Sequence, residues 1–244
     1  MADDWNMPEG NLMKGKRGIV MGVANQNSIA WGISKQLAAQ GAEIAFTYQG
    51  DSLERRVRPL VESIGMDTMI PADVTDDASM DAAFAQVKDK WGKIDFLVHS
   101  IAFANREDLE RAFSLTSREG FRLALEISAY SLLPIVRHAL PLMTDGGSIV
   151  TMTFQASQRV FPNYNVMGTA KAALEHEVRQ LAAEVGPSNI RVNAISAGPL
   201  DTLAARGIHG FIDMKHIHAE RSPLRRNITH EEVAKTALYL CSDL

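Results

Sequence analysis

Short apolar segments alternate with helix-like segments along the whole chain of 244 residues. Each apolar segment is bounded by turn residues and has the length of a buried strand. We expect strands at 17–22, 43–48, 69–72, 94–99, 147–153 and 190–195. The segments between them predict helices at about 28–40, 52–64, 76–90 and 117–140, and a helix begins near 162. This alternation predicts an α/β fold with a doubly wound parallel sheet and helices on both faces.

Composition favours one domain over 1–244. The apolar content of 46% suits a packed core, and neither a repeat nor a long linker divides the sequence. The net charge of −4 gives no basic field, so we expect no nucleic-acid partner. We find no run of about 20 apolar residues, which argues against a membrane span. An acidic N-terminus within a loose arm at 1–16, and the single Cys241, fit a protein of the reducing cytoplasm.

The first strand and the helix after it predict a phosphate site. The turn between them begins at Gly22 and contains Ala24, and the helix opens near Ser28 and Ile29. Free backbone N–H groups at Ser28 and Ile29 would face an anion, aided by the positive end of the helix. The glycine spacing differs from G-x-G-x-x-G, and many strand–helix turns bind nothing, so a purely structural turn remains the alternative.

Polar and small residues also follow the other strands, and the carboxyl ends of parallel strands share one edge of a sheet, where ligands bind. Gln49 ends the second strand; it can bond a ribose hydroxyl but cannot pair a 2′-phosphate, which favours NADH. Asp73 follows the third strand and fits either an adenine partner or a helix cap. The same edge would receive residues after the fourth, fifth and sixth strands, namely Ser100–Ala102, Thr153 and Gly198–Thr202. Their convergence predicts a dinucleotide cofactor.

Tyr164 and Lys171 are the candidate catalytic pair. They stand seven residues apart in a helix-like run, so their side chains would leave one face about 10 Å apart. Tyr164 could donate a hydrogen bond to a substrate oxygen while Lys171 holds a cofactor hydroxyl. The Lys171 charge would also make the phenol a better acid. A surface pair on an ordinary helix is the alternative.

The remaining titratable residues give weaker patterns. His99 fits a structural residue at a strand end better than a catalyst. His209, His216 and His218 lack the spacing of a metal site, so we expect no metal. Asp76 and Asp77 fit the start of a helix.

Several strings, taken together, are specific to one family. They are Gly22-Val23-Ala24 with Ser28-Ile29-Ala30, Phe46-Thr47-Tyr48-Gln49, His99-Ser100-Ile101, Tyr164 to Gly168 with Lys171, and Arg191 to Pro199. With them, the chain from about Lys14 to Leu244 resembles the enoyl-acyl-carrier-protein reductases of bacterial fatty-acid synthesis. These form a divergent branch of the short-chain dehydrogenase/reductase superfamily. The spacing Tyr-x6-Lys separates this branch from the larger one, which uses Tyr-x3-Lys.

The resemblance implies a Rossmann fold, a homotetramer, and reduction by NADH or NADPH of a trans-2-enoyl thioester carried by acyl carrier protein. It implies that Tyr164 stabilises the developing enolate and that Lys171 binds the nicotinamide ribose. The cofactor residues it implies are Gly22, Ala24, Ser28, Ile29, Gln49, Asp73, Val74, Ser100, Ile101, Ala102, Lys171, Pro199, Leu200 and Thr202. The substrate residues it implies are Phe154, Tyr164, Leu203 and Phe211, with a closing loop at Leu203 to Phe211 inside the region 201–220.

The sequence departs from the family in four places. Phe154 replaces a tyrosine found in many members, and Ala102 replaces a glycine beside the cofactor. Ile212 and Asp213 stand where positive charge is usual, which leaves only His209 and Lys215 and a weaker basic surface for an acidic carrier protein. The family also continues with another strand beyond Leu244, so we expect an unpaired sheet edge.

Two alternatives follow from these departures. A related reductase of another enoyl or carbonyl substrate, such as an enoyl-CoA, is favoured by Phe154 and by the weaker basic patch. A nucleotide-binding scaffold without catalysis is the other, and the intact Tyr164 and Lys171 argue against it.

Overall fold

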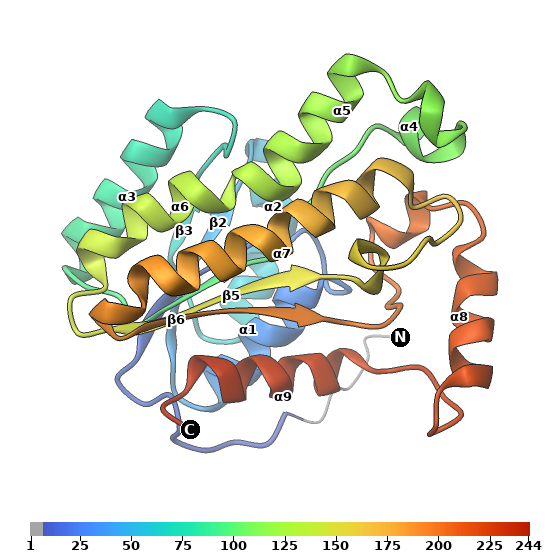
Figure 1. The fold of residues 1–244 in the computed structure, drawn as a ribbon. Coiled ribbons are helices and arrows are strands. Elements are labelled where there is room, and N and C mark those ends of the chain that lie inside the picture. Colours follow the sequence, from blue (N-terminus) through green and yellow to red (C-terminus); the bar gives the residue numbers. More distant parts are fainter. Residues whose placement is uncertain (1–6) are drawn as a thin grey trace.

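A computed structural model describes residues 7–244, which form one sheet between two layers of helices (Figure 1). All six strands pair in parallel, in the order β3-β2-β1-β4-β5-β6. The strands are β1 (Arg17–Met21), β2 (Glu43–Tyr48), β3 (Met69–Pro71), β4 (Phe96–His99), β5 (Gly147–Thr153) and β6 (Ile190–Ser196). The doubly wound α/β fold predicted from the alternation is therefore confirmed.

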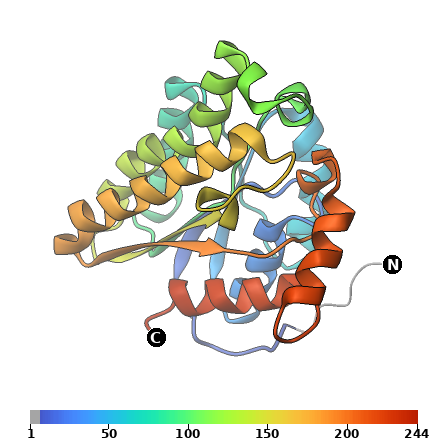
Figure 2. The same cartoon turned by 45° about the vertical axis from the view of Figure 1, so that its right-hand side comes forward.

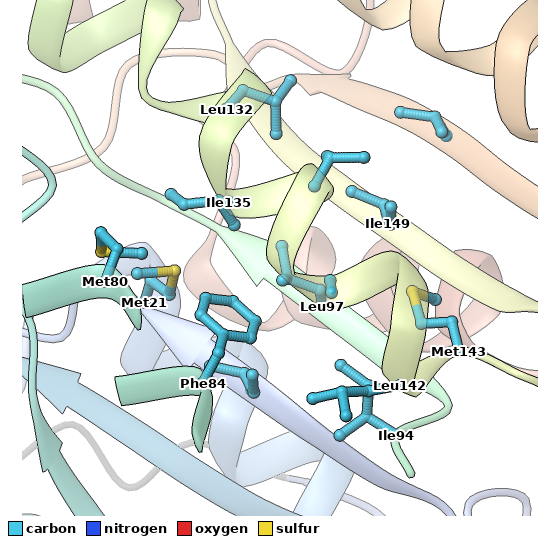
Figure 3. Packing of buried hydrophobic residues seen from close by; sticks show 14 of the residues in the cluster. Met21, Met80, Phe84, Ile94, Leu97, Leu132, Ile135, Leu142, Met143 and Ile149 are labelled. Atoms are coloured by element: carbon cyan, nitrogen blue, oxygen red, sulfur yellow. The ribbon is translucent and has the colours of Figure 1, made fainter. Parts of the chain in front are cut away.

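Helices cover both faces of the sheet. One face carries α1 (Ile29–Ala39), α2 (Asp51–Ser63) and α9 (His230–Cys241), and the other carries α3 (Asp77–Trp91), α6 (Leu132–Ala139) and α7 (Asn165–Val185) (Figure 1). Alternate residues of one strand enter different cores, as the pleat requires. In β4, for example, Leu97 packs towards α3 and α6, whereas Val98 packs towards α1 and α9. Figure 3 shows the first of these cores, where Leu97 lies near Ile135.

The predicted helix at 117–140 is divided. It consists of α5 (Arg118–Leu125), a π-helical turn η2 (Glu126–Tyr130) and α6. Pro134 has no N–H to give to the carbonyl one turn earlier, and the backbone widens just before it. The amide of Ser131 accordingly donates to Glu126 O, five residues back, at 3.0 Å. The disturbance expected at Pro134 is confirmed and falls one turn earlier.

The run Arg118–Leu142 is long and apolar enough to cross a membrane by length and composition alone, although the sequence was not expected to contain such a run. Its apolar side chains are used inside the protein. Leu132, Ile135 and Val136 are at most 1% exposed and pack against the sheet (Figure 3). This run is therefore the core helix of a folded domain.

The expectation of a loose arm at 1–16 is wrong for its second part. Met13 is fully buried, and its amide donates to Gln40 O at 2.9 Å. The amide of Gly10 donates to Ala39 O at 3.0 Å. The arm thus closes the end of α1, while residues 1–6 lie outside the described part of the chain.

Two regions hold more helix than the pattern predicted. Between β4 and α5 lie α4 (Arg106–Glu110) and the short η1 (Phe113–Leu115). The segment after β6, which lacks clean periodicity, contains η6 (Ala205–Gly207) and α8 (Phe211–Arg221). Helix α8 stands beyond the carboxyl ends of β5 and β6 (Figures 1 and 2). The short connections η3 (Leu140–Leu142), η4 (Gln155–Ser157) and η5 (Gly186–Ser188) complete the fold.

Candidate active site

The parallel register brings the predicted residues to one edge of the sheet. Met21 pairs with Thr47 and with His99, and His99 pairs with Thr151. The turns that follow these residues therefore begin side by side, as expected for a ligand site at the carboxyl ends of the strands.

The turn between β1 and α1 is held by Ser28. Its hydroxyl oxygen accepts from the amides of Ala24 and Asn25 at 3.0 and 3.1 Å. The Ser28 amide itself donates to Asn25 O at 3.1 Å, so the expectation that this N–H is free for an anion is wrong. Ile29 is the first residue of α1, where backbone amides have no carbonyl one turn earlier. Gly22, with φ of 100°, allows this turn to lie directly against the Ser100 carbonyl.

Gln49 and Asp73 bind each other beyond β2 and β3. The Gln49 amide donates to Asp73 Oδ2 at 2.8 Å, and Asp73 Oδ1 accepts from the Thr75 amide at 2.9 Å. Asp73 does not cap α3, because that cap is Asp76, which accepts from the Ala78 amide. Burial opposes ionisation of Asp73, but its hydrogen bonds outweigh burial and lower its pKa. The pair therefore offers a ribose a negative charge and an amide, but no cation for a 2′-phosphate.

Beyond β4, the loop that begins at Ser100 is fixed from the π-helical turn. The Ser128 hydroxyl accepts from the Phe103 amide at 2.9 Å and donates to Phe103 O at 3.0 Å. Ser128 is fully buried. Sequence reasoning did not identify it, and the only signal was a serine in an apolar helical run. The π-helical turn thus shapes the loop that contains Ile101 and Ala102.

His99 is fully buried and has a structural role, as predicted. Its Nδ1 lies 2.8 Å from Thr151 Oγ1, and its Nε2 lies 2.9 Å from Ser131 Oγ. Because Ser131 donates its own proton to Ile127 O, it must accept from His99, which carries the proton on Nε2. Burial, and then the charge of Lys171, lower the His99 pKa to about 3, so the ring is neutral.

Lys171 is buried on the face of α7 that packs on β5. Its ammonium donates to Met152 O at 2.7 Å. Burial lowers its pKa to about 8, and the negative charge of Glu175 opposes that shift. At neutral pH the side chain therefore remains mostly protonated and keeps its positive charge.

Tyr164 does not lie inside the helix, contrary to the expected geometry. Helix α7 begins at Asn165, and Tyr164 is the residue just before it. Asn163 and Asn165 have φ of 63° and 38°, a left-handed conformation that asparagine tolerates better than most residues. Two helical turns therefore do not describe the separation of Tyr164 from Lys171, and the helix start predicted at Pro162 is two to three residues early.

The acidity expected of Tyr164 is also corrected. Burial raises the pKa of the phenol, because it disfavours the charged phenolate. Tyr164 consequently keeps its proton and acts as a neutral O–H donor. Its ring lies 5.0 Å from that of Phe154, and Phe154 lies 4.8 Å from Phe161, so an apolar wall stands beside the phenol.

The asparagines around Tyr164 connect it to neighbouring segments. Asn163 donates to His209 O at 2.8 Å, which joins the tyrosine turn to the segment before α8. Asn165 donates to Arg111 O at 2.8 Å, and to carbonyls at Asp108 and Leu109, which anchors α4. These contacts were missed because they join segments distant in the sequence.

The segment after β6 places its predicted residues differently. Pro199 and Leu200 are buried, and Thr202 accepts from the Ala205 amide at 3.1 Å. Leu203 is 50% exposed, whereas Phe211 is 8% exposed. Phe211 therefore packs inside the protein, and only Leu203 of this predicted substrate pair presents a broad surface.

The basic patch expected at His209 and Lys215 carries less free positive charge than the sequence suggested. Lys215 pairs with Asp201 at 2.5 Å, while Ile212 and Asp213 are exposed. Within residues 7–244, no group of His, Cys, Asp and Glu side chains could hold a metal ion.

The residues at this edge fit a nicotinamide dinucleotide from end to end. The first turn of α1 offers amides near Ile29, and Gln49 with Asp73 offers ribose and adenine partners at one end. Lys171 and Tyr164 lie at the other end, on and just before α7.

Known proteins resemble this chain along nearly its whole length. The family described as "Enoyl-(Acyl carrier protein) reductase" matches residues 22–244. "Enoyl-[acyl-carrier-protein] reductase [NADH] 2" of Rhizobium meliloti is 52% identical over 233 residues, which cover 96% of this chain and 87% of that protein.

Solved structures agree. FabI of Candidatus Liberibacter asiaticus has a TM-score of 0.93 and 47% identity, and the match covers 96% of this chain and 90% of that one. The reductase of Anaplasma phagocytophilum, solved with NAD, has a TM-score of 0.94 and 47% identity, covering 98% and 91% of the two chains. The chain therefore belongs to the enoyl-(acyl carrier protein) reductase family.

Proposed function

We propose that this protein reduces the trans-2 double bond of enoyl thioesters carried by acyl carrier protein, using NADH, in fatty-acid elongation. The observation that carries the proposal is the arrangement at the start of α7. A neutral, half-buried Tyr164 phenol and a charged, buried Lys171 lie at the carboxyl edge of the sheet.

NADH, when bound, supplies the hydride that adds to the β carbon of the substrate. Tyr164 donates a hydrogen bond to the thioester oxygen, where negative charge builds, and so stabilises the transition state. Lys171 holds a ribose hydroxyl near the nicotinamide. Phe154 and Phe161 keep water from one side of the phenol, which strengthens its hydrogen bond in a medium of low polarity.

Gln49 and Asp73 support NADH over NADPH. The ionised Asp73 would repel a 2′-phosphate, and Gln49 has no charge to offset that repulsion. NADPH remains a weaker cofactor in this proposal, since the related reductase of Bacillus cereus was solved with NADP+.

The proposal extends to a homotetramer in the cytoplasm. Exposed aromatic side chains gather in and around α4, η1 and α5, and a second copy would cover them. They are Phe103, Phe113, Phe121 and Tyr130, which are 39–53% exposed. Light scattering on the purified full chain measures the subunit number, and a monomer at all concentrations contradicts this part.

The test is turnover. The full chain is mixed with trans-2-dodecenoyl acyl carrier protein and NADH, and oxidation of the cofactor is followed by absorbance. We expect turnover, with NADPH slower at equal concentration. Failure with both cofactors, on both carrier-linked and coenzyme A thioesters, would refute the proposed reaction.

A further inference from the structure

Glu175 lies one helical turn after Lys171 on α7, and it contacts the end of β5. Its Oε1 accepts from Thr153 Oγ1 at 2.8 Å and from Ser157 Oγ at 2.5 Å. Thr153 is the last residue of β5, and Ser157 is the last residue of the turn η4, so Phe154 lies between the two donors. One carboxylate oxygen therefore ties both ends of this short connection to the helix.

Two other contacts hold the same connection against α7. Lys171 donates to Met152 O, the carbonyl just before Thr153. Gly168 lies against the Ala156 carbonyl, and a Cβ there would approach that oxygen to 3.0 Å, tighter than most real contacts. Helix α7 thus contacts this connection at three successive turns, through Gly168, Lys171 and Glu175.

We propose that Glu175 is a positioning residue, whose carboxylate clamps the connection from Thr153 to Ser157 onto α7, one turn from Lys171. The connection contains Phe154, whose ring packs on Tyr164. The clamp thereby sets the wall against which the phenol rests. The inference rests on the proposed function for its effect on turnover, but not for its effect on the structure.

The charges around Lys171 show why Glu175 matters. His99 on β4 is neutral, and Tyr164 before α7 keeps its proton. Glu175 supplies the negative charge that favours the ammonium of Lys171. Glu175 is itself kept ionised. Burial raises the pKa of its carboxyl group, but this effect is outweighed by the hydrogen bonds from Ser157 and Thr153 and by the charge of Arg179 on α7, so the pKa is lowered overall.

Glu175→Gln tests the charge, and Ser157→Ala tests the clamp with the charge retained. The matched control is Glu184→Gln, the same change at an exposed position of the same helix. The first readout is hydrogen–deuterium exchange of the amides from 153 to 158 in the cofactor-free protein. We expect exchange about tenfold faster in both variants, as loss of a hydrogen bond to a charged group predicts, and unchanged exchange in the control.

The second readout is the dissociation constant of NADH against pH, followed by cofactor fluorescence. In Glu175→Gln the alkaline loss of binding should move to lower pH, because Lys171 loses its proton more easily. In Ser157→Ala it should stay in place, while kcat falls more than the KM for NADH changes. A melting curve checks folding, and if Glu175→Gln does not fold, Ser157→Ala alone decides through its exchange rate.

The outcomes separate this inference from the proposed function. Wild-type turnover, with exchange and pH dependence unmoved in the variants, overturns the role of Glu175 alone. Absence of wild-type turnover refutes the reaction, yet faster exchange at 153–158 would still establish the clamp.

Discussion

At the scale of single residues, the site depends on how burial shifts the pKa values of Tyr164 and Lys171. Burial keeps the Tyr164 proton in place and brings the pKa of Lys171 down to about 8. The first effect makes a dependable hydrogen-bond donor. The second makes a cation that is expensive to bury and that folding must tolerate.

Tyr164→Phe should abolish most turnover while leaving NADH binding within about twofold. Removing a donor to a developing oxyanion typically lowers kcat by about 10²–10³-fold. The measurement is steady-state kcat beside an NADH titration. Tyr239→Phe, at an exposed tyrosine of α9, is the control and should match the wild type. A normal rate in Tyr164→Phe would show that the phenol is not the donor.

Lys171→Met should stabilise the fold at neutral pH while removing activity. A pKa lowered from 10.5 to about 8 corresponds to roughly 3 kcal/mol, and the lost bond to Met152 O returns roughly 1 kcal/mol of that. The unfolded chain binds the proton more tightly, so wild-type stability rises between about pH 8 and 10.5. The gain in the variant should shrink over that window and reverse above it.

Denaturant unfolding at several pH values measures this effect. Lys88→Met, on the exposed side of α3, serves as the control and should show no such pH-dependent gain. A variant less stable than the wild type at neutral pH would mean that the burial cost of Lys171 is compensated within the fold.

At the scale of elements, the strands and most helices can be predicted from the sequence, whereas the points at which one element gives way to the next cannot. The strands are predicted within two residues of their ends, because alternation and apolar runs are local signals. The start of α7 is misplaced because Asn163 and Asn165 adopt left-handed backbone, stabilised by carbonyls of other segments. Pro134 indicates a disturbance of the helix, but the partners of Ser128 in the π-helical turn and of Ser131 just after it cannot be predicted, because they are brought close only by folding.

The same limit applies to the site. The edge of the sheet at which the candidate residues lie could be predicted, since parallel strands gather their carboxyl ends. The use of the Ser28 amide could not, because its partner is chosen by the shape of the turn. Nor could Glu175, whose partners lie 18 and 22 residues away and have no sequence signature.

Helix α9 offers a test of how much an N-terminal cap contributes to stability. Thr229 and Glu232 form a capping box, in which each side chain bonds the other residue's amide. Thr229→Ala should lower the free energy of unfolding by about 1 kcal/mol. Thr236→Ala, which removes an exposed threonine inside the same helix, should change it little. Thermal or denaturant unfolding distinguishes them, and equal effects would refute a special role for the cap.

At the scale of the whole molecule, two apolar cores lie on opposite faces of one sheet, and the polar residues of the candidate site lie at the carboxyl ends of its strands. The net charge of −4 disfavours a strongly acidic partner unless a local patch attracts it. On α8, Asp213 is exposed and Lys215 is already paired with Asp201, so these two positions offer little positive charge to an acidic partner.

Asp213→Lys should therefore lower the KM for carrier-linked substrate, because it replaces repulsion by attraction on the α8 surface. The KM for a short uncharged enoyl thioester should not change. Both are measured by initial rates at low salt, and the difference should fade at high salt, where surface charges are screened. An equal effect on both substrates would place the change outside carrier docking.

The Ser28 hydroxyl holds the amides of Ala24 and Asn25, so the turn after β1 has its shape before any dinucleotide arrives. Its conformational entropy is lost when the chain folds, and little of it remains to be lost on binding. In the proposed site, the phosphates of the cofactor would therefore meet a turn that is already ordered. Ordering of this turn should accordingly contribute little to the binding heat measured by calorimetry.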